Sequence, residues 1–261
     1  MVGTQNWSRM SKKNKEAIRH KLRGRILDYI ISQLNDTNDV FFIHELPGSE
    51  INLLRDSITV MRPDFSLAVP ESLGYINTVA VYAPKVCDFG VNNYVCCQGT
   101  YGKRKFSKDS YINRIICLRN KQDNSLLFGV HVKSEDIHNF YQLLSNVHSD
   151  LPVATHVLYI GDFNACDPDM PAKSLLCDFM SLGLVDIWAE LGGRHTTYTR
   201  TSSKKTYRID YALTDGRSFS DLRKKYSMYV DRRFPDLSDH YPIILAKELP
   251  ADKKLIKAGK D

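Results

Sequence analysis

The stretch Gly161-Asp162-Phe163-Asn164-Ala165 (GDFNA) decides the fold class, because it follows directly on the apolar run His156 to Ile160. An apolar run of this length that ends in a polar turn is typical of a buried strand. In α/β scaffolds, ligands are held where such strands end. Asp162 and Asn164 are therefore candidate site residues at the end of a core strand.

Four more places along the chain show the same arrangement of polar residues beside an apolar run. They are Glu45 in IHEL, His131 in GVHVKS, Asp210 in YRIDYAL and the pair Asp239-His240 in SDHYPI. A charged group beside a core strand is costly unless it is paired, bound to a metal or facing a cleft. One such residue is ordinary in a folded protein, but five such places in one chain indicate a shared site.

The rest of the chain alternates between strand-like and helix-like segments. The periodicity of apolar residues predicts helices at 12–34, 136–147 and 173–182, the last one capped by Gly183. Strands are predicted at 40–43, 78–82, 113–118, 126–132, 156–160, 196–199, 208–214, 225–230 and 241–245. This alternation predicts an α/β or α+β fold in a single domain, residues 1–250. The Lys-rich tail, residues 251–261, is expected to be frayed.

The composition is that of an ordinary globular protein. The 261 residues are 43% hydrophobic and 25% charged, which excludes a disordered chain or a fibre. The net charge of +6 fits either a polyanionic partner, such as nucleic acid or anionic lipid, or a solvated basic surface. No run reaches the roughly 18 apolar residues of a membrane span. The sequence contains no signal for the oligomeric state.

The beginning of the chain and its cysteines indicate an intracellular protein. Residues 1–10 contain no apolar segment of the kind found in secretory signals. The six cysteines are therefore expected to be reduced thiols, mostly buried. They are Cys87, Cys96, Cys97, Cys117, Cys166 and Cys177.

The candidate residues share one kind of chemistry. The carboxylates of Glu45, Asp162 and Asp210 are hard oxygen ligands, which suit Mg²⁺ or Mn²⁺ better than zinc. His131 and His240 can exchange protons near neutral pH. Adjacent residues on an extended chain point apart, so we expect His240 to pair with a carboxylate other than that of its neighbour in the sequence.

Several competing motifs are excluded by single positions. His44-Glu45 begins like a zinc-binding HExxH helix, but Gly48 stands where the second histidine is needed and Pro47 breaks the helix. Asp162-x-Asn164 begins like an EF-hand loop, but Asp167 occupies the glycine position. The chain contains neither a P-loop nor a nucleophile-elbow motif.

In their order along the chain, these motifs resemble those of the endonuclease/exonuclease/phosphatase superfamily, whose fold is called DNase I-like. GDFN alone is weakly specific, but GDFN followed by RIDY and then SDHYP is a specific signature. TTYTR at residues 196–200 also fits the pattern, and Asn6 in TQNWS corresponds to the first motif. The likeness extends from Asn6 to Leu245.

The resemblance implies a four-layer α/β (α+β) sandwich, in which two facing mixed β-sheets are flanked by helices. The site is then expected at one end of the sheets. The family pattern implies that Glu45 binds Mg²⁺, helped by Asn6 and Asp239.

Catalytic roles are also implied by the family pattern. Asp162 and Asn164 are expected to orient the attacking water and the phosphate, and Asp210 to support the metal or the phosphate. His240 is expected to act as a general base or to contact the phosphoryl oxygens. His131 is expected to donate a hydrogen bond to the phosphate or to the leaving oxygen. Which histidine is the acid and which the base stays open.

The substrate suggested by these features is nucleic acid, with DNA ahead of RNA. Lys103, Arg104 and Lys105 lie between aromatic residues, a composition suited to backbone phosphates and base stacking. For this loop taken singly, a solvated turn with a few packing aromatic residues is the slightly better explanation. Tyr198 and Arg208 are further candidates for substrate binding.

Two other functions stay open. The first is a phosphodiesterase or phosphatase of the same fold that acts on another phosphoester, such as a sphingomyelin-like lipid headgroup or a small phosphoester. The inositol-phosphatase branch is disfavoured, because its Pro-Ala-Trp-Cys-Asp-Arg run is replaced here by KTYRID, residues 205–210. The second is a binding module without activity, although such relics usually lose a metal ligand or the final histidine.

Overall fold

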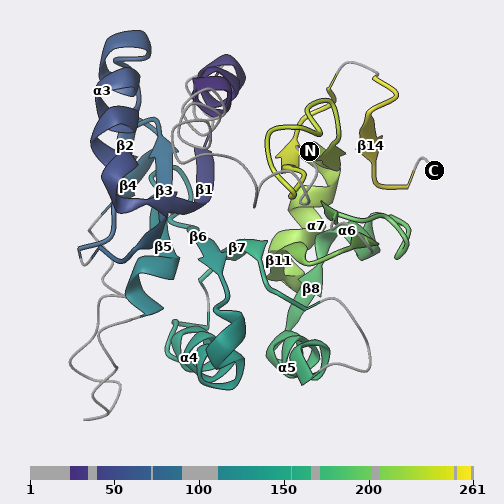
Figure 1. Ribbon diagram of the computed structural model, residues 1–261. Coiled ribbons are helices and arrows are strands. Elements are labelled where there is room, and N and C mark those ends of the chain that lie inside the picture. The colour runs from purple at the N-terminus through teal and green to yellow at the C-terminus, as the bar shows by residue number, and fades with distance from the viewer. Residues whose placement is uncertain are drawn as a thin grey trace, which may run out of the picture.

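The computed structural model shows two sheet layers with helices on their outer sides (Figure 1). The described residues are 24–34, 40–71, 73–89, 111–153, 155–165, 171–201, 206–249 and 252–259. No described helix is both long enough and apolar enough to cross a membrane.

The first layer is a six-stranded mixed sheet in the order β4-β5-β6-β7-β11-β8. Its strands are β4 (Cys87–Phe89), β5 (Ile115–Asn120), β6 (Leu126–His131), β7 (Val157–Asp162), β8 (Leu184–Asp186) and β11 (Asp210–Asp215). Strands β6 and β7 are parallel, connected by helix α4 (Ile137–Ser149), and the other neighbours are antiparallel. The central strands are mostly buried and apolar apart from polar residues at their ends, as is typical of strands covered on both faces.

The second layer consists of two three-stranded antiparallel sheets. One has the order β1-β3-β2 and the other the order β13-β12-β14. Their strands are β1 (Val40–Pro47), β2 (Ser66–Ala68), β3 (Ile76–Tyr82), β12 (Ser227–Asp231), β13 (Ile243–Ala246) and β14 (Leu255–Lys257). We expected one mixed sheet in this layer, but in the described part of the chain no backbone ladder joins β1 to β13.

Helices complete the four layers. Helix α4 and helix α5 (Pro171–Met180) pack on the outer face of the six-stranded sheet through a cluster around Phe140 and Phe179. The helix at residues 24–33 and α3 (Ile51–Met61) pack on β1 and β3. Helices α6 (Ile187–Glu190) and α7 (Gly216–Lys225) join a third cluster around Trp188. The fold class is the expected sandwich of α and β layers.

Several predicted elements differ from the structure. The predicted strand 196–199 is a turn that leads into the short strand β9 (Arg200–Thr201), which pairs with β10 (Thr206–Tyr207). Residues 113–114 belong to a 3₁₀ turn rather than to a strand. The tail is not frayed at residues 255–257, because β14 pairs with β12 there. Of the predicted helix 12–34, only the part from residue 24 onward lies within the described residues.

The described cysteines are free thiols. Cys87 and Cys117 are buried and Cys177 is exposed. Burial, with the neighbouring charges of Asp88 and Asp123, raises the pKa of the Cys87 thiol to about 11. Cys87 is therefore a protonated, inert core residue.

Candidate active site

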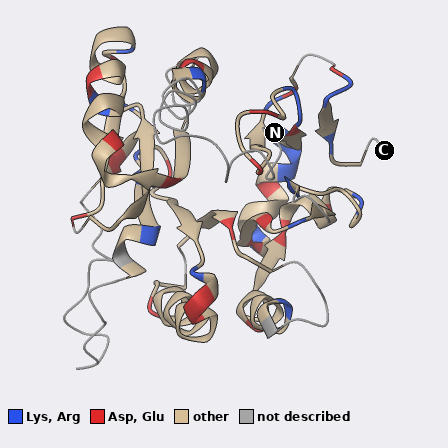
Figure 2. Ribbon diagram, in the orientation of Figure 1, with Lys and Arg blue, Asp and Glu red and all other residues tan. Residues whose placement is uncertain are grey.

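Three polar residues form a row across the middle of the six-stranded sheet. His131 is the register partner of Asp162 across the parallel pair β6–β7, and Asp162 is the partner of Asp210 across the antiparallel pair β7–β11. All three are buried. Figure 2 shows acidic residues where β7 and β11 meet. The three motifs found in the sequence are thus brought together by strand pairing.

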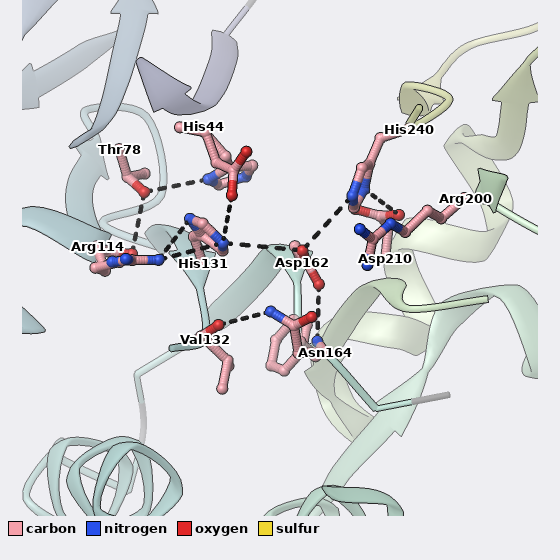
Figure 3. Close-up of polar contacts among 12 residues, drawn as sticks. His44, Thr78, Arg114, His131, Val132, Asp162, Asn164, Arg200, Asp210 and His240 are labelled. Atoms are coloured by element: carbon pink, nitrogen blue, oxygen red, sulfur yellow. Dashed lines mark hydrogen bonds and ion pairs between the residues drawn. The ribbon is translucent and has the colours of Figure 1, made fainter. Parts of the chain in front are cut away.

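His240 lies against this row from the facing layer (Figure 3). Its Nδ1 is 3.1 Å from Oδ2 and 3.2 Å from Oδ1 of Asp210. Its Nε2 is 3.9 Å from Oδ2 of Asp162. The side chain of Asp239 instead forms an ion pair with Arg200, with 3.1 Å between Oδ2 and Nε. The expectation that His240 pairs with a carboxylate other than Asp239 is therefore confirmed.

His131 lies between a cation and two carboxylates. Nη1 of Arg114 is 3.2 Å from Nδ1 of His131. On the other side of the ring, Nε2 is 3.5 Å from Oε1 of Glu45 and 3.9 Å from Oδ2 of Asp162. The same Nη1 is also 3.3 Å from Nε2, so Arg114 does not select a tautomer, but the carboxylates beside Nε2 favour a ring proton there.

These side chains surround a cavity of ≈170 Å³. Its lining is almost wholly polar, with Ile76 as the one apolar residue among the described ones. The lining residues are Glu45, Ile76, Arg114, His131, Ser134, Glu135, Asp162, Asn164, Arg200, Asp239 and His240. A cavity with both carboxylates and cations suits a small charged group better than an apolar ligand.

The backbone around the row is fixed by buried polar contacts. Oγ1 of Thr199 accepts from the backbone N–H groups of Ile209 and Asp210, at 3.2 and 3.1 Å. The turn after β7 is closed by the Asn164 N–H, which donates to Oδ1 of Asp162 at 2.8 Å. Gly161 has φ 144°, and a Cβ there would lie 2.0 Å from the carbonyl oxygen of Val130. The glycine of GDFN is therefore required by close strand packing.

Asp162 and His240, at the centre of the site, hold a proton more strongly than usual. Burial, together with the charge of Asp210, raises the pKa of Asp162 to about 7. For His240, burial opposes protonation, but the hydrogen bond and charge of Asp210 outweigh it and raise the pKa to about 9. The site thus attracts positive charge at neutral pH.

The other two histidines of the site are neutral. Burial, followed by the nearby His44, lowers the pKa of His131 to about 2. Burial also lowers the pKa of His44 to about 4. Each of these rings therefore acts near neutral pH as an uncharged hydrogen-bonding group.

The donor atoms at the site fit a divalent cation of the Mg²⁺ type. One ligand atom from each of Asp162, Asp210 and His240 lies within 4.8 Å of the others, and Glu45 contributes a further carboxylate to the cavity. Carboxylate oxygens are the preferred ligands of Mg²⁺ and Mn²⁺. Burial and the facing charge of Asp210 raise the pKa of Asp162, and a bound cation would offset both effects.

Comparisons with known proteins agree with this architecture. An AP endonuclease from Archaeoglobus fulgidus has a TM-score of 0.61 at 17% identity, over 85% of this chain and 94% of that chain. D. rerio TDP2 in complex with a single-strand DNA product has a TM-score of 0.56 at 15% identity, over 86% and 91% of the two chains. The chain therefore has the fold that is called DNase I-like. No family model and no curated protein matches the sequence.

Within this DNase I-like fold, most of the predicted site residues lie together. His131, Asp162, Asn164, Asp210 and His240 converge at the cavity, with Asp210 reaching it through His240. Glu45 and Asp239 line the cavity as well. Asn6, Lys103, Arg104 and Lys105 lie outside the described residues.

Two predicted substrate-binding residues have protein partners. The guanidinium of Arg208 forms a buried ion pair with Asp186, with Nη2–O distances of 2.5 and 2.6 Å, and stacks on Tyr211. It is not among the residues that line the cavity. The ring of Tyr198 is covered by the guanidinium of Arg232, 3.8 Å from the ring centroid. These contacts give Arg208 a structural role in the DNase I-like scaffold.

Six polar residues at or near the cavity were not predicted to belong to the site. Four of them line the cavity, namely Arg114, Ser134, Glu135 and Arg200, and the other two, His44 and Thr78, are hydrogen-bonded to each other nearby. His44 was considered only as part of a zinc motif. The signal that points to Arg114 is weak, because it follows a loop rather than ending a strand. Arg200, by contrast, lies in the motif TTYTR, which the DNase I-like pattern contains.

Proposed function

We propose that the protein is a Mg²⁺-dependent or Mn²⁺-dependent phosphodiesterase that hydrolyses nucleic acid, with DNA ahead of RNA, as an endonuclease. The observation that carries this proposal is the row of His131, Asp162 and Asp210 in strand register, with His240 hydrogen-bonded to Asp210. Such a row places proton carriers and oxygen ligands around one phosphate-sized cavity. The fold shared with an AP endonuclease and with TDP2 supports it.

The cation would be held by Glu45, with Asn6 and Asp239, while the carboxylates of Asp162 and Asp210 add to the negative charge that attracts it. It would neutralise negative charge that develops on the phosphoryl oxygens. Asp162 is suited to accept a proton from the attacking water, because its pKa is raised to about 7. Asn164, beside it, orients the water and the phosphate. These roles need a water molecule in line with the leaving oxygen. Asp162 and Asn164 both line the cavity in which such a water would be held.

The electrostatics separate the roles of the two histidines. His240, whose pKa is raised to about 9, is a cation at neutral pH and donates from Nε2 to a phosphoryl oxygen. Asp210 holds it through Nδ1 and keeps it charged. His131 stays neutral and donates from Nε2 to the phosphate or to the leaving oxygen. The carboxylates of Glu45 and Asp162 beside Nε2 favour this tautomer.

The test is nicking of supercoiled plasmid in Mg²⁺, in Mn²⁺ and in chelator. The wild type is expected to nick only with metal. Asp162→Ala and His240→Ala are expected to lose activity by several orders of magnitude, because each change removes several kcal/mol of transition-state stabilisation. Nicking by either variant at the wild-type rate would contradict the site assignment.

The same assay on other substrates separates the alternatives. RNA, abasic DNA, tyrosyl-linked DNA and sphingomyelin headgroups are assayed beside plasmid. Preference for the lipid headgroup would replace the nucleic-acid proposal by the other phosphoester function. Absence of metal-dependent hydrolysis on every substrate would favour a binding module.

A further inference from the structure

Glu45 has an unusual backbone conformation. Its φ is 57°, in the left-handed region, and it stands in a β-bulge of β1 between Ile43 and Leu46. For a residue other than glycine this conformation costs about 1–2 kcal/mol and persists only where the surroundings enforce it. The Glu45 side chain is 67% exposed, so its own packing cannot supply this force.

Two consecutive residues of β3 hold the neighbours of Glu45 on either side. The hydroxyl of Thr78 lies 3.2 Å from Nδ1 of His44, the residue before Glu45. The amide of Asn77 donates to the carbonyl oxygen of Leu46, the residue after it, at 3.1 Å. Thr78 is 0% and Asn77 1% exposed, so water does not compete for these bonds.

The direction of the hydrogen bonds follows from the number of protons available. The Thr78 hydroxyl donates its one proton to the backbone oxygen of Arg114 at 3.1 Å. Its oxygen therefore accepts from His44, which must carry its proton on Nδ1. The ring of His44 is also confined from the other layer, since a Cβ at Gly161 would lie 2.6 Å from its Nε2.

We propose that Asn77 and Thr78 are positioning residues that clamp Glu45 in its left-handed conformation and so aim its carboxylate into the cavity. The same Thr78 hydroxyl fixes the backbone of Arg114, whose side chain orients His131. One buried hydroxyl thus fixes the positions of both Glu45 and His131, whose Oε1 and Nε2 atoms are 3.5 Å apart. The inference rests on the proposed function in one respect, because it takes Glu45 to be a ligand of the divalent cation.

The experiment compares three variants with the wild type. Thr78→Val keeps the shape of the side chain and removes the hydroxyl, and Thr78→Ser keeps the hydroxyl. Thr214→Val is the matched control, because Thr214 is 1% exposed and donates to the carbonyl oxygen of Val157 at 2.6 Å. Thr214 lies four residues along β11 from Asp210, away from the cavity. Mn²⁺ affinity is measured by electron paramagnetic resonance, together with the free energy of unfolding in chelator, kcat and KM.

Removing a group that orients a metal ligand typically weakens metal binding about 10–100-fold. We therefore expect Thr78→Val to weaken Mn²⁺ binding about tenfold or more, and Thr78→Ser to stay close to the wild type. Thr214→Val is expected to lose stability similarly while keeping wild-type Mn²⁺ affinity. Equal Mn²⁺ affinity of Thr78→Val and Thr214→Val would overturn the clamp.

The two proposals fail in different ways. If the wild type binds Mn²⁺ but hydrolyses no phosphodiester, the proposed function is wrong, and the Mn²⁺ affinities of the two valine variants still decide on the clamp. If the wild type binds no Mn²⁺, both are wrong. If it hydrolyses DNA and Thr78→Val binds Mn²⁺ normally, only the clamp is wrong.

Discussion

At the scale of single residues, two residues of the site have an unfavourable backbone conformation. Glu45 and Asn164 both have positive φ values, of 57° and 49°. Asparagine tolerates this region better than glutamate does. The strained backbone at Glu45 therefore lowers the stability of the fold, as is common at functional sites.

Replacement of Glu45 by glycine tests this strain directly. Glycine adopts positive φ without a Cβ clash, so Glu45→Gly is expected to be about 1 kcal/mol more stable than Glu45→Ala. The measurement is urea unfolding in chelator. At Val60, an exposed position within helix α3, the same pair of substitutions should give the opposite order. Equal stability of the two Glu45 variants would mean that the backbone is not strained.

The ion pair between His240 and Asp210 predicts a pH-dependent stability. The pKa of His240 is raised from 6.5 to about 9, so the pair stabilises the fold fully below pH 6.5 and loses this effect as the pH rises through 9. In chelator, His240→Gln should cost on the order of 2 kcal/mol at pH 6 and much less at pH 10.

The matching measurement uses Asp210→Asn as the background. There His240 has lost its main partner, so the pH dependence of the His240→Gln effect should shrink. Unfolding curves at several pH values give the difference between each pair of proteins. A pH-independent cost of His240→Gln in the wild-type background would show that the ion pair contributes nothing.

At the scale of elements, the central strands and the two helices on the outer face of the six-stranded sheet were predicted, whereas helices α3 and α7 and the short elements were not. Strands β6 and β7 and helices α4 and α5 lie within a few residues of their predicted positions. Strand β14, with only three residues in a Lys-rich segment, has no periodicity of its own. It exists because β12 offers it a free edge, which is a tertiary effect.

Removal of β14 should therefore destabilise the protein although its sequence is that of a tail. Leu255 and Ala258 are buried, and β14 covers the edge of β12. Deletion of residues 252–261 is expected to cost about 2 kcal/mol, which lowers Tm by about 4–8 °C in a protein of this size. Deletion of residues 260–261 alone is the control. Identical Tm values for the two truncated proteins would show that β14 adds no stability.

At the scale of the whole molecule, the site joins residues that are far apart in the sequence. Asp162 and Asp210 were recognisable in the sequence from their positions at strand ends. The order of the motifs was recognisable as well. Their direct pairing across β7 and β11 was not predictable, because register depends on which strands become neighbours. The role of Thr78 was hidden for the same reason, since a buried threonine in an apolar strand is ordinary until His44 and Arg114 lie beside it.

The net charge of +6 bears on the substrate at this scale. If the protein acts on nucleic acid, its binding releases counterions, so log(kcat/KM) for an oligonucleotide should fall linearly with log salt concentration. The slope is about 0.7–0.9 per phosphate contact. Hydrolysis of a small phosphodiester such as bis(p-nitrophenyl) phosphate, with a single phosphate, should depend on salt far less.

Replacing Lys103, Arg104 and Lys105 together by serine identifies the source of this slope. If all three side chains contact phosphates of the nucleic acid, the slope of log(kcat/KM) against log salt concentration for the oligonucleotide should decrease in magnitude by about 2–3. The value of kcat/KM for the small substrate should stay unchanged. The control replaces Arg223, Lys224 and Lys225, the basic last turn of α7, which lies away from the cavity. An unchanged slope in the first variant, with a reduced slope in the second, would assign nucleic-acid binding to the face that carries α7. Strong salt dependence for the small substrate would instead mean that the slope reflects the cavity itself and not contacts along a strand.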